Sequence, residues 1–210
     1  MSKTNGKNKI ANPNEFYETP AWCTKAILNE LHELQLNPNN VLDPCVGTGA
    51  IASVVRELYP KANIDIIDIE ESLIREAIKK ISLKEKDIVN NFENQIGLPM
   101  NNYFISNYLE TSLKKDEYDL IVLNPPFSLA QEFVEKSIEL SPNGSVVVLL
   151  RLNWLASKKR IAFHKKHPSD IFVLPKRPSF TNDGKTDGTE YAWFCFGPKF
   201  KGNQWKILDM

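Results

Sequence analysis

The most unusual stretch of the chain is "DLIVLNPPFS", residues 119–128, in which an apolar run ends in an amide, two prolines and an aromatic ring. Four consecutive apolar residues are typical of a strand covered on both faces. Asn124 precedes a proline and is therefore held outside the helical region, while Pro125 is restricted by its own ring and by Pro126. The Asn124 side-chain oxygen and the Pro125 carbonyl are thus two acceptors held in fixed directions.

Two fixed acceptors suit an exocyclic amino group, because both of its hydrogens can be bound at once. Phe127 follows directly and offers a flat surface on which a ring carrying that amino group can stack. The stretch therefore predicts a site for an aromatic amine, with catalytic roles for Asn124, Pro125, Pro126 and Phe127.

A second motif is "VLDPCVGTGAIA", residues 41–52. A predicted strand ends at Asp43, Gly47 and Gly49 supply a tight turn that a ligand can approach, and the free amides of the following helix point to the same place. The motif lacks the third glycine of the dinucleotide fingerprint, where Ala52 stands, and the Gly-Lys-Ser/Thr of a P-loop. The acidic residue before the turn favours a neutral or cationic ligand over a pyrophosphate.

Two more strand ends carry polar side chains. Asp68 comes 25 residues after Asp43, near the offset of about 20 residues at which an acid binds ribose hydroxyls, and Ile69 beside it can cover an adenine. The alternative is that Asp68 only caps the next helix. Asn107 and Tyr108 offer an amide and a ring to a base edge, although taken alone they are better explained as an ordinary turn.

These motifs need a scaffold, and the sequence predicts one by alternation. Helical patterns cover 20–34, with Thr19 as its cap, and 49–59, 70–81, 129–140 and 157–167. Strand patterns cover 40–44, 63–68, 102–108, 118–124, 144–150, 170–175 and 189–197. We expect an α/β fold with a mainly parallel, doubly wound sheet, and a C-terminal antiparallel hairpin at one edge because no helix separates the last two strands. Residues 1–15 are expected to form a flexible arm and 16–210 a single domain, with 82–100 either a helix or a long loop.

Charge and cysteine usage restrict the partners. The net charge is zero, yet residues 151–185 hold nine basic and two acidic residues, which indicates either a polyanionic partner or a solvated helix face. Three scattered cysteines argue against a disulfide framework and a zinc site. Without a signal peptide or a long apolar stretch, we expect a cytoplasmic protein that binds no membrane and no metal, as a monomer or weak homodimer.

"DPCVGTGA" followed 81 residues after Asp43 by "NPPF" resembles the amino-methylating class of S-adenosylmethionine-dependent methyltransferases, in particular small phage or prophage-type DNA adenine-N6 enzymes. "FYETPAWCTKAIL" (16–28) is similar to a segment that contacts the methionine end of the cofactor in some of these enzymes, and "RPSFTNDGKTDGTEYAWFCFG" (177–197) to their C-terminal region. The resemblance implies a Rossmann-like class I methyltransferase fold with S-adenosyl-L-methionine as cofactor. It implies that the cofactor is bound by Tyr17, Thr19, Pro20, Asp43, Cys45, Gly47, Gly49, Asp68, Ile69, Asn107 and Tyr108. Asn107 stands where the family usually has Asp.

The resemblance also implies a nucleic-acid substrate, with DNA favoured over RNA. The residues expected to contact it are Arg151, Asn153, Trp154, Lys158, Lys159, Arg160, Lys165, Lys166, Lys176 and Arg177. Three alternatives stay open: methylation of adenine or guanine amino groups in RNA, methylation of glutamine amides, for which NPPY is the related motif, and a non-catalytic subunit that binds nucleic acid for a partner.

Overall fold

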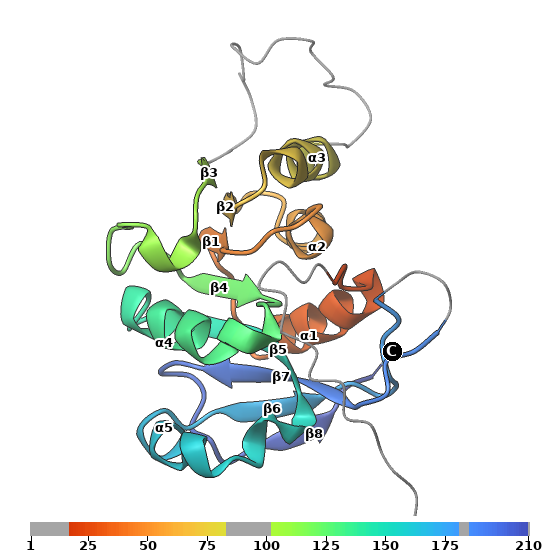
Figure 1. The fold of residues 1–210 in the computed structure, drawn as a ribbon, viewed down its shortest axis with the longest axis vertical. Helices are drawn as coiled ribbons and strands as arrows, with labels where there is room; N and C mark the ends of the chain where they lie inside the picture. The colour runs from red at the N-terminus through yellow and green to blue at the C-terminus, as the bar shows by residue number, and fades with distance from the viewer. Residues whose placement is uncertain (1–16, 83–101, 181–184, 210) are drawn as a thin grey trace, which may run out of the picture.

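The computed structural model of the protein describes residues 17–82, 102–180 and 185–209, and within them one sheet has the strand order β3-β2-β1-β4-β5-β7-β6-β8 (Figure 1). The strands are β1 (Asn40–Asp43), β2 (Asn63–Asp68), β3 (Tyr103–Ile105), β4 (Leu120–Leu123), β5 (Ser145–Arg151), β6 (Asp170–Val173), β7 (Tyr191–Phe196) and β8 (Trp205–Ile207). β1 to β5 pair in parallel, and β7 runs antiparallel between β5 and β6.

Helices cover both faces of the sheet (Figure 1). They are α1 (Ala21–Glu33), α2 (Ala50–Leu58), α3 (Glu71–Ser82), α4 (Ala130–Leu140) and α5 (Ile161–Lys166), with 3₁₀ turns η1 (Tyr108–Glu110), η2 (Phe127–Leu129), η3 (Leu152–Leu155) and η4 (Lys158–Arg160). The first three helices pack with alternate strand residues such as Val41 into one core. α4 and α5 pack with residues such as Leu42 into the other core. The parallel strands are apolar on both sides because each side meets a helix layer.

The expected hairpin forms, but not where the sequence placed it. β6 and β7 pair antiparallel as predicted, whereas β7 lies inside the sheet and the edge is formed by β8, a strand that the sequence did not predict. All six residues of β7 are buried, whereas buried and partly exposed residues alternate along β6. An interior position between two strands therefore removes more apolar surface from water for β7 than it would for β6. β8 has only three residues, too few for a recognisable pattern.

Three local predictions also need correction. Thr19 does not cap α1, because Pro20 occupies the N-cap and no side chain bonds there. The strand expected over 102–108 ends at Ile105, since Asn107 starts the η1 turn. The helix expected over 157–167 is a 3₁₀ turn followed by the short α5. The expected arm (1–15) and the undecided segment from 83 to 100 lie outside the described residues.

The sheet brings the polar strand ends together. β1 lies between β2 and β4, so the strand order reverses beside β1, and β1, β2 and β4 all point their carboxyl ends to one edge. Ligands of open parallel sheets bind at such a reversal. In the part of the chain that the structure describes, no helix is long and apolar enough to cross a membrane.

Gly49 sets the distance between two helices of this scaffold. Its φ is +83°, and a Cβ built on it would lie 2.9 Å from Cα of Ala77 in α3. We expect Gly49→Ala to lower the free energy of unfolding by about 2–4 kcal/mol, because it adds a left-handed strain and a backbone clash. Urea denaturation measures this. Gly188→Ala is the matched control, since nothing lies within 4 Å of its added Cβ; equal losses in the two variants would contradict the explanation.

Candidate functional site

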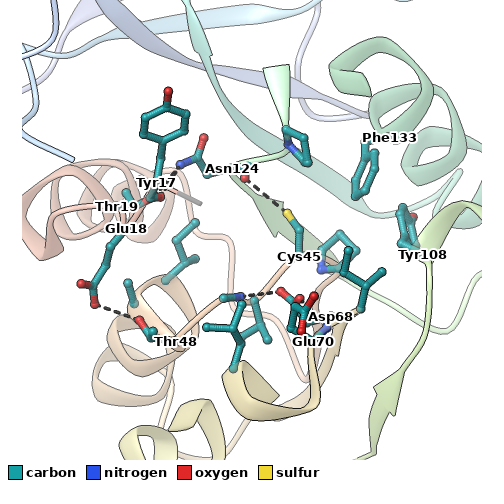
Figure 2. A pocket seen from close by; sticks show the side chains of 18 of the residues that line it. Tyr17, Glu18, Thr19, Cys45, Thr48, Asp68, Glu70, Tyr108, Asn124 and Phe133 are labelled. Atoms are coloured by element: carbon teal, nitrogen blue, oxygen red, sulfur yellow. Dashed lines mark hydrogen bonds between the residues drawn. The ribbon is translucent and has the colours of Figure 1, made fainter. Parts of the chain in front are cut away.

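A pocket of about 260 Å³ opens at the carboxyl ends of β1, β2 and β4 (Figure 2). Its walls come from residues 17–19, the glycine turn after β1, the end of β2, the turn after β3 and the NPPF segment. They are Tyr17, Glu18, Thr19, Pro44, Cys45, Val46, Gly47, Thr48, Ala50, Ile51, Asp68, Ile69, Glu70, Leu73, Ser106, Asn107, Tyr108, Asn124, Pro126, Leu129 and Phe133. The pocket therefore joins motifs that are more than 100 residues apart in the sequence.

The Asn124 side chain is oriented by two hydrogen bonds. Its Nδ2 donates to the Tyr17 carbonyl oxygen at 3.2 Å and to Thr19 Oγ1 at 3.0 Å. A carbonyl can only accept, so the amide nitrogen must face residues 17–19 and the oxygen must face the other way. That oxygen, Oδ1, is shielded from solvent and has no hydrogen-bond partner among the described residues. In Figure 2 it points away from Cys45 and Asp68.

The Pro125 carbonyl is the second acceptor that the sequence singled out. Pro125 is buried, and among the described residues its carbonyl oxygen accepts no hydrogen bond. The neighbouring Pro126 carbonyl differs, because it accepts from Leu129 N at 2.9 Å at the start of α4. One side-chain oxygen and one main-chain oxygen are therefore left without donors at the end of β4, where buried acceptors normally have partners.

Residues 17–20, which we call the N-terminal strap, connect opposite walls of the pocket. Beyond the two contacts to Asn124, Glu18 Oε1 accepts from Thr48 Oγ1 at 2.9 Å and from Lys80 Nζ at 2.6 Å. The hydrogen bond from Lys80 lowers the pKa of the Glu18 carboxyl, so this carboxyl is ionised at neutral pH. The strap thus ties the NPPF segment to the glycine turn and to α3.

The glycine turn is held against the end of β2. Gly47 has a φ of 53°, and its N–H donates to Asp68 Oδ2 at 2.9 Å, while Glu70 N donates to Asp68 Oδ1 at 3.1 Å. Each Asp68 oxygen keeps acceptor capacity beyond these single bonds. On the other side of the turn, Cys45 Sγ donates to the Asn124 carbonyl oxygen at 3.4 Å. Burial raises the pKa of the Cys45 thiol well above its ordinary value, so it acts as a donor and not as a nucleophile.

Asp43 lies behind this turn instead of on the pocket wall. Its side chain is 1% exposed, Oδ2 has no partner among the described residues, and the contact from Cys45 N to Oδ1 is long at 3.4 Å. Burial raises the pKa of Asp43 to about 8, and the negative charge of Asp68 acts in the same direction. Asp43 and Gly49, which packs on Ala77, are absent from the residues that line the pocket, and their expected contact with the cofactor stays a prediction. Pro20 is also absent from the pocket wall.

The turn after β3 uses its polar atoms internally. Asn107 Oδ1 accepts from Leu109 N at 3.1 Å and Nδ2 donates to Glu110 at 2.7 Å, so the side chain caps η1. Tyr108 is buried, with its hydroxyl 3.1 Å from Ser137 Oγ in α4. Both residues line the pocket, and their expected contact with a bound adenine stays a prediction.

Phe127 is not the open surface that the sequence indicated. Its ring lies against Tyr17 at 5.6 Å and Tyr191 at 5.9 Å between centroids. The guanidinium of Arg151 lies over it, 4.3 Å from its centroid. The NPPF segment therefore contacts the end of β5 and β7 as well as the strap.

The basic segment divides into exposed and packed side chains. Trp154 is buried against Phe163 and Phe194, so its expected contact with nucleic acid is wrong: the ring fills the second core. Arg160 donates to the Trp154 carbonyl oxygen at 2.6 Å, and Arg177 pairs with Glu190. Of the ten residues expected to contact nucleic acid, those whose side chains remain exposed to solvent are Asn153, Lys158, Lys159, Lys165, Lys166, Lys176 and Arg177.

Eight of the eleven expected cofactor residues line the pocket, and so do Asn124 and Pro126. The sequence analysis did not identify Glu18 and Thr48, although both lie inside the quoted motifs. For Glu18 the available signal was its position between Tyr17 and Thr19, two residues expected to contact the cofactor. The sequence also missed Phe133, because a ring on an amphipathic helix looks like any core residue. Among the described residues, no group of three His, Cys, Asp or Glu could hold a metal ion.

The wall chemistry fits S-adenosylmethionine. Glu18, Asp68 and Glu70 place carboxylates on the pocket wall, which favours a ligand carrying sulfonium and ammonium charges. Asp68, held by two main-chain N–H groups, can accept ribose hydroxyls, and Ile69 is 47% exposed beside it for an apolar ring face.

Comparison with known proteins points in the same direction. A family model described as "Methyltransferase small domain" matches residues 21–153. The chain is 38% identical over 117 residues to a release factor glutamine methyltransferase of Fusobacterium nucleatum, a match that covers 54% of this chain and 29% of that protein. It is 31% identical over 120 residues to the ribosomal RNA small subunit methyltransferase C of Aliivibrio fischeri, a match that covers 52% of this chain and 31% of that protein. The chain thus spans about a third of the length of these relatives.

Among solved structures, a candidate RNA methyltransferase of Pyrococcus horikoshii superimposes with a TM-score of 0.65 at 16% identity, covering 89% of each chain. At this identity the likeness concerns the fold alone. It confirms the α/β fold that the alternation of helices and strands predicted and the class I methyltransferase architecture that the resemblance implied.

The strap should contribute to cofactor affinity through its ion pair. We expect Lys80→Met to weaken S-adenosylmethionine binding about two- to fivefold, because this partly exposed pair is worth only about 0.5–1 kcal/mol. Isothermal titration calorimetry measures the dissociation constant. Lys79→Met on the exposed face of α3 is the control and should bind like the wild type; an unchanged constant in Lys80→Met would separate the strap from the cofactor.

Asp43 should make the cofactor-free protein less stable at high pH. Its folded pKa, about 8, lies above the ordinary aspartate value of 3.8, so the folded state binds more protons between these values and stability falls as pH rises through that window. We expect Asp43→Asn to flatten the dependence of the unfolding free energy on pH between about 4 and 8. Urea denaturation at several pH values measures it, and a parallel slope in the two proteins would exclude Asp43 as the cause.

Proposed function

The chain belongs to the methyltransferase small domain family, and we propose that it transfers a methyl group from S-adenosylmethionine to the exocyclic amino group of a base in a polynucleotide. Family membership confirms the expected cofactor. The observation that carries the substrate proposal is the oriented Asn124 amide, whose Oδ1 is buried without a partner beside the pocket.

An unsatisfied buried oxygen costs free energy that a donor from the substrate would recover. The group that suits it carries two hydrogens on one nitrogen, since the Pro125 carbonyl is the second acceptor at the same strand end. Water and hydroxyl groups can also donate, but they lack the planar ring that Phe127 could stack. An amino group on an aromatic ring satisfies all three residues.

The chemistry follows from these contacts. When bound, S-adenosylmethionine supplies an electrophilic methyl group on a positively charged sulfur. The nitrogen of an aromatic amine is a weak nucleophile because its lone pair is delocalised into the ring. Hydrogen bonds to Asn124 Oδ1 and the Pro125 carbonyl favour a pyramidal nitrogen and stabilise the positive charge that grows on it. Positioning supplies much of the remaining acceleration, so no general base is needed before transfer.

The exposed cations favour a polynucleotide over a protein. Lys158, Lys159, Lys165 and Lys166 follow β5 on η4 and α5, are exposed, and form no ion pair among the described residues. A run of free cations matches a phosphate backbone. One relative is named for the methylation of glutamine in a protein, a substrate that has no phosphate to bind these cations. Glutamine methylation is therefore the alternative to a polynucleotide substrate.

The type of polynucleotide is the next choice. The names of two similar proteins refer to RNA, whereas DNA adenine is favoured by the NPPF resemblance. RNA is therefore the first substrate to test, with the adenine and guanine amino groups as targets, and DNA adenine N6 is the second.

The decisive experiment combines tritiated S-adenosylmethionine with RNA, DNA and a glutamine-bearing protein, followed by digestion to nucleosides or amino acids. We expect label in a base methylated on its amino nitrogen. Asn124→Ala should lower the rate at least about 100-fold, the effect of removing a group that stabilises charge in a transition state.

Asn124→Ala also removes the two bonds to the strap, so calorimetry should show somewhat weaker cofactor binding, but a loss far smaller than the fall in rate, which separates catalysis from folding. Label in glutamine alone would replace the polynucleotide proposal. Cofactor binding without transfer to any of the three polymers would favour the non-catalytic subunit.

A further inference from the structure

Four aromatic side chains from distant segments form a closed ring of contacts, which we call the aromatic box. Tyr17 comes from the strap, Phe127 from NPPF, Phe180 from the segment after β6, and Tyr191 from the start of β7. Phe127 lies 5.6 Å from Tyr17 and 5.9 Å from Tyr191, and Phe180 lies 5.7 Å and 5.0 Å from the same two rings. The box thus joins the strap that orients Asn124 to the C-terminal hairpin.

Arg151 covers this box. It is the last residue of β5, the strand beside β4, and its guanidinium lies 4.3 Å from the Phe127 ring centroid. Nε donates to Tyr191 Oη at 3.1 Å, Nη2 lies 3.6 Å from Asp187 Oδ2, and Tyr191 Oη donates to the same Asp187 oxygen at 2.6 Å. The Arg151 side chain is 39% exposed, so the cation is oriented by the protein and still open to solvent.

This arrangement conflicts with base stacking unless Arg151 moves. The ring face over which the guanidinium lies is then unavailable to a base. Asn124 Oδ1 is shielded at the same time. The substrate side of the site is therefore closed in this structure, and the displaceable group on it is a planar cation with five N–H donors.

A nucleotide can exchange for that cation at little cost. Its base takes over the ring contact on Phe127, and its phosphate offers the guanidinium a bidentate partner stronger than an aromatic ring and a carboxylate 3.6 Å away. A glutamine side chain offers neither group. The exchange therefore requires a ring and an anion in the same substrate.

Resting on the function proposed above, we propose that Arg151 selects the substrate: the target base displaces its guanidinium from Phe127, and the guanidinium then binds the phosphate of that nucleotide. Asp187 and Tyr191 hold Arg151 ready for this exchange. Selection for nucleotides is then built into the closed site itself, before any contact with the exposed lysines.

The test compares oligonucleotides that carry either a normal phosphate or an uncharged methylphosphonate at the target nucleotide, in the polymer that the wild-type protein methylates. For the wild type, we expect the methylphosphonate to raise KM about tenfold with a smaller change in kcat, because one phosphate contact is lost. Arg151→Met should show a raised KM for both oligonucleotides and no difference between them. The slope of log Kd against log salt concentration should fall by about one in this variant.

Two further variants keep the result interpretable. Arg151→Lys retains the charge and should retain the salt slope, with a KM between those of the wild type and Arg151→Met. Arg75→Met, the same change at an exposed arginine that pairs with Glu71 on α3, should behave as the wild type. Calorimetric binding of S-adenosylmethionine verifies that each variant is folded.

The outcomes separate the two proposals. An equal methylphosphonate effect in the wild type and in Arg151→Met would overturn the role of Arg151 while leaving methyl transfer to the polynucleotide intact. No transfer by the wild type to RNA or DNA, or label in glutamine alone, would overturn the proposed function and this inference with it.

Discussion

The pair of hydrogen bonds that the Asn124 amide nitrogen donates to the strap is the contact on which the rest of the site depends. These bonds decide which side-chain atom is left to meet a substrate, and they do so with a main-chain carbonyl and a buried hydroxyl, neither of which is charged. Because Pro125 and Pro126 carry no N–H, the two residues that follow Asn124 cannot donate to its free oxygen. The strap supplies the acceptors for the amide nitrogen, and one of them, Thr19, lies 105 residues before Asn124 in the chain.

The same strap links the two halves of the pocket. Through Glu18 it reaches Thr48 and Lys80, beside the glycine turn, and through Tyr17 it reaches Phe127 and Phe180. Cofactor and substrate sides are therefore parts of one hydrogen-bonded and packed unit. The pocket wall carries the carboxylates of Glu18, Asp68 and Glu70, whereas the cation of Arg151 covers Phe127 of the NPPF segment. This separation of charge suits the proposed pair of a cationic cofactor and an anionic substrate.

Much of the scaffold can be predicted from the sequence, because parallel strands buried on both faces appear as continuous apolar runs between helix-length segments. The expected edge position of β7 is wrong, although its six consecutive apolar residues, all buried in the structure, are typical of an interior strand. The resemblance implies a cofactor contact for Asp43, whereas its side chain is buried and absent from the pocket wall. The place of Trp154 directly after a strand predicts a ring at the rim of the site, whereas it packs on Phe163 and Phe194. Over segments this short, the spacing of apolar residues does not show which side chains are buried and which line a site.

The sequence by itself determined which groups could act: a proline-restricted amide and carbonyl, a glycine turn, and an acid at the next strand end. Local covalent restriction and strand alternation are enough for that, since both operate within a few residues. Only the tertiary structure decided how the groups are used. It directed the Asn124 nitrogen into the strap, left its oxygen free, buried Asp43, and laid Arg151 over Phe127. Each of these depends on a contact between segments far apart in the chain, which no local pattern encodes.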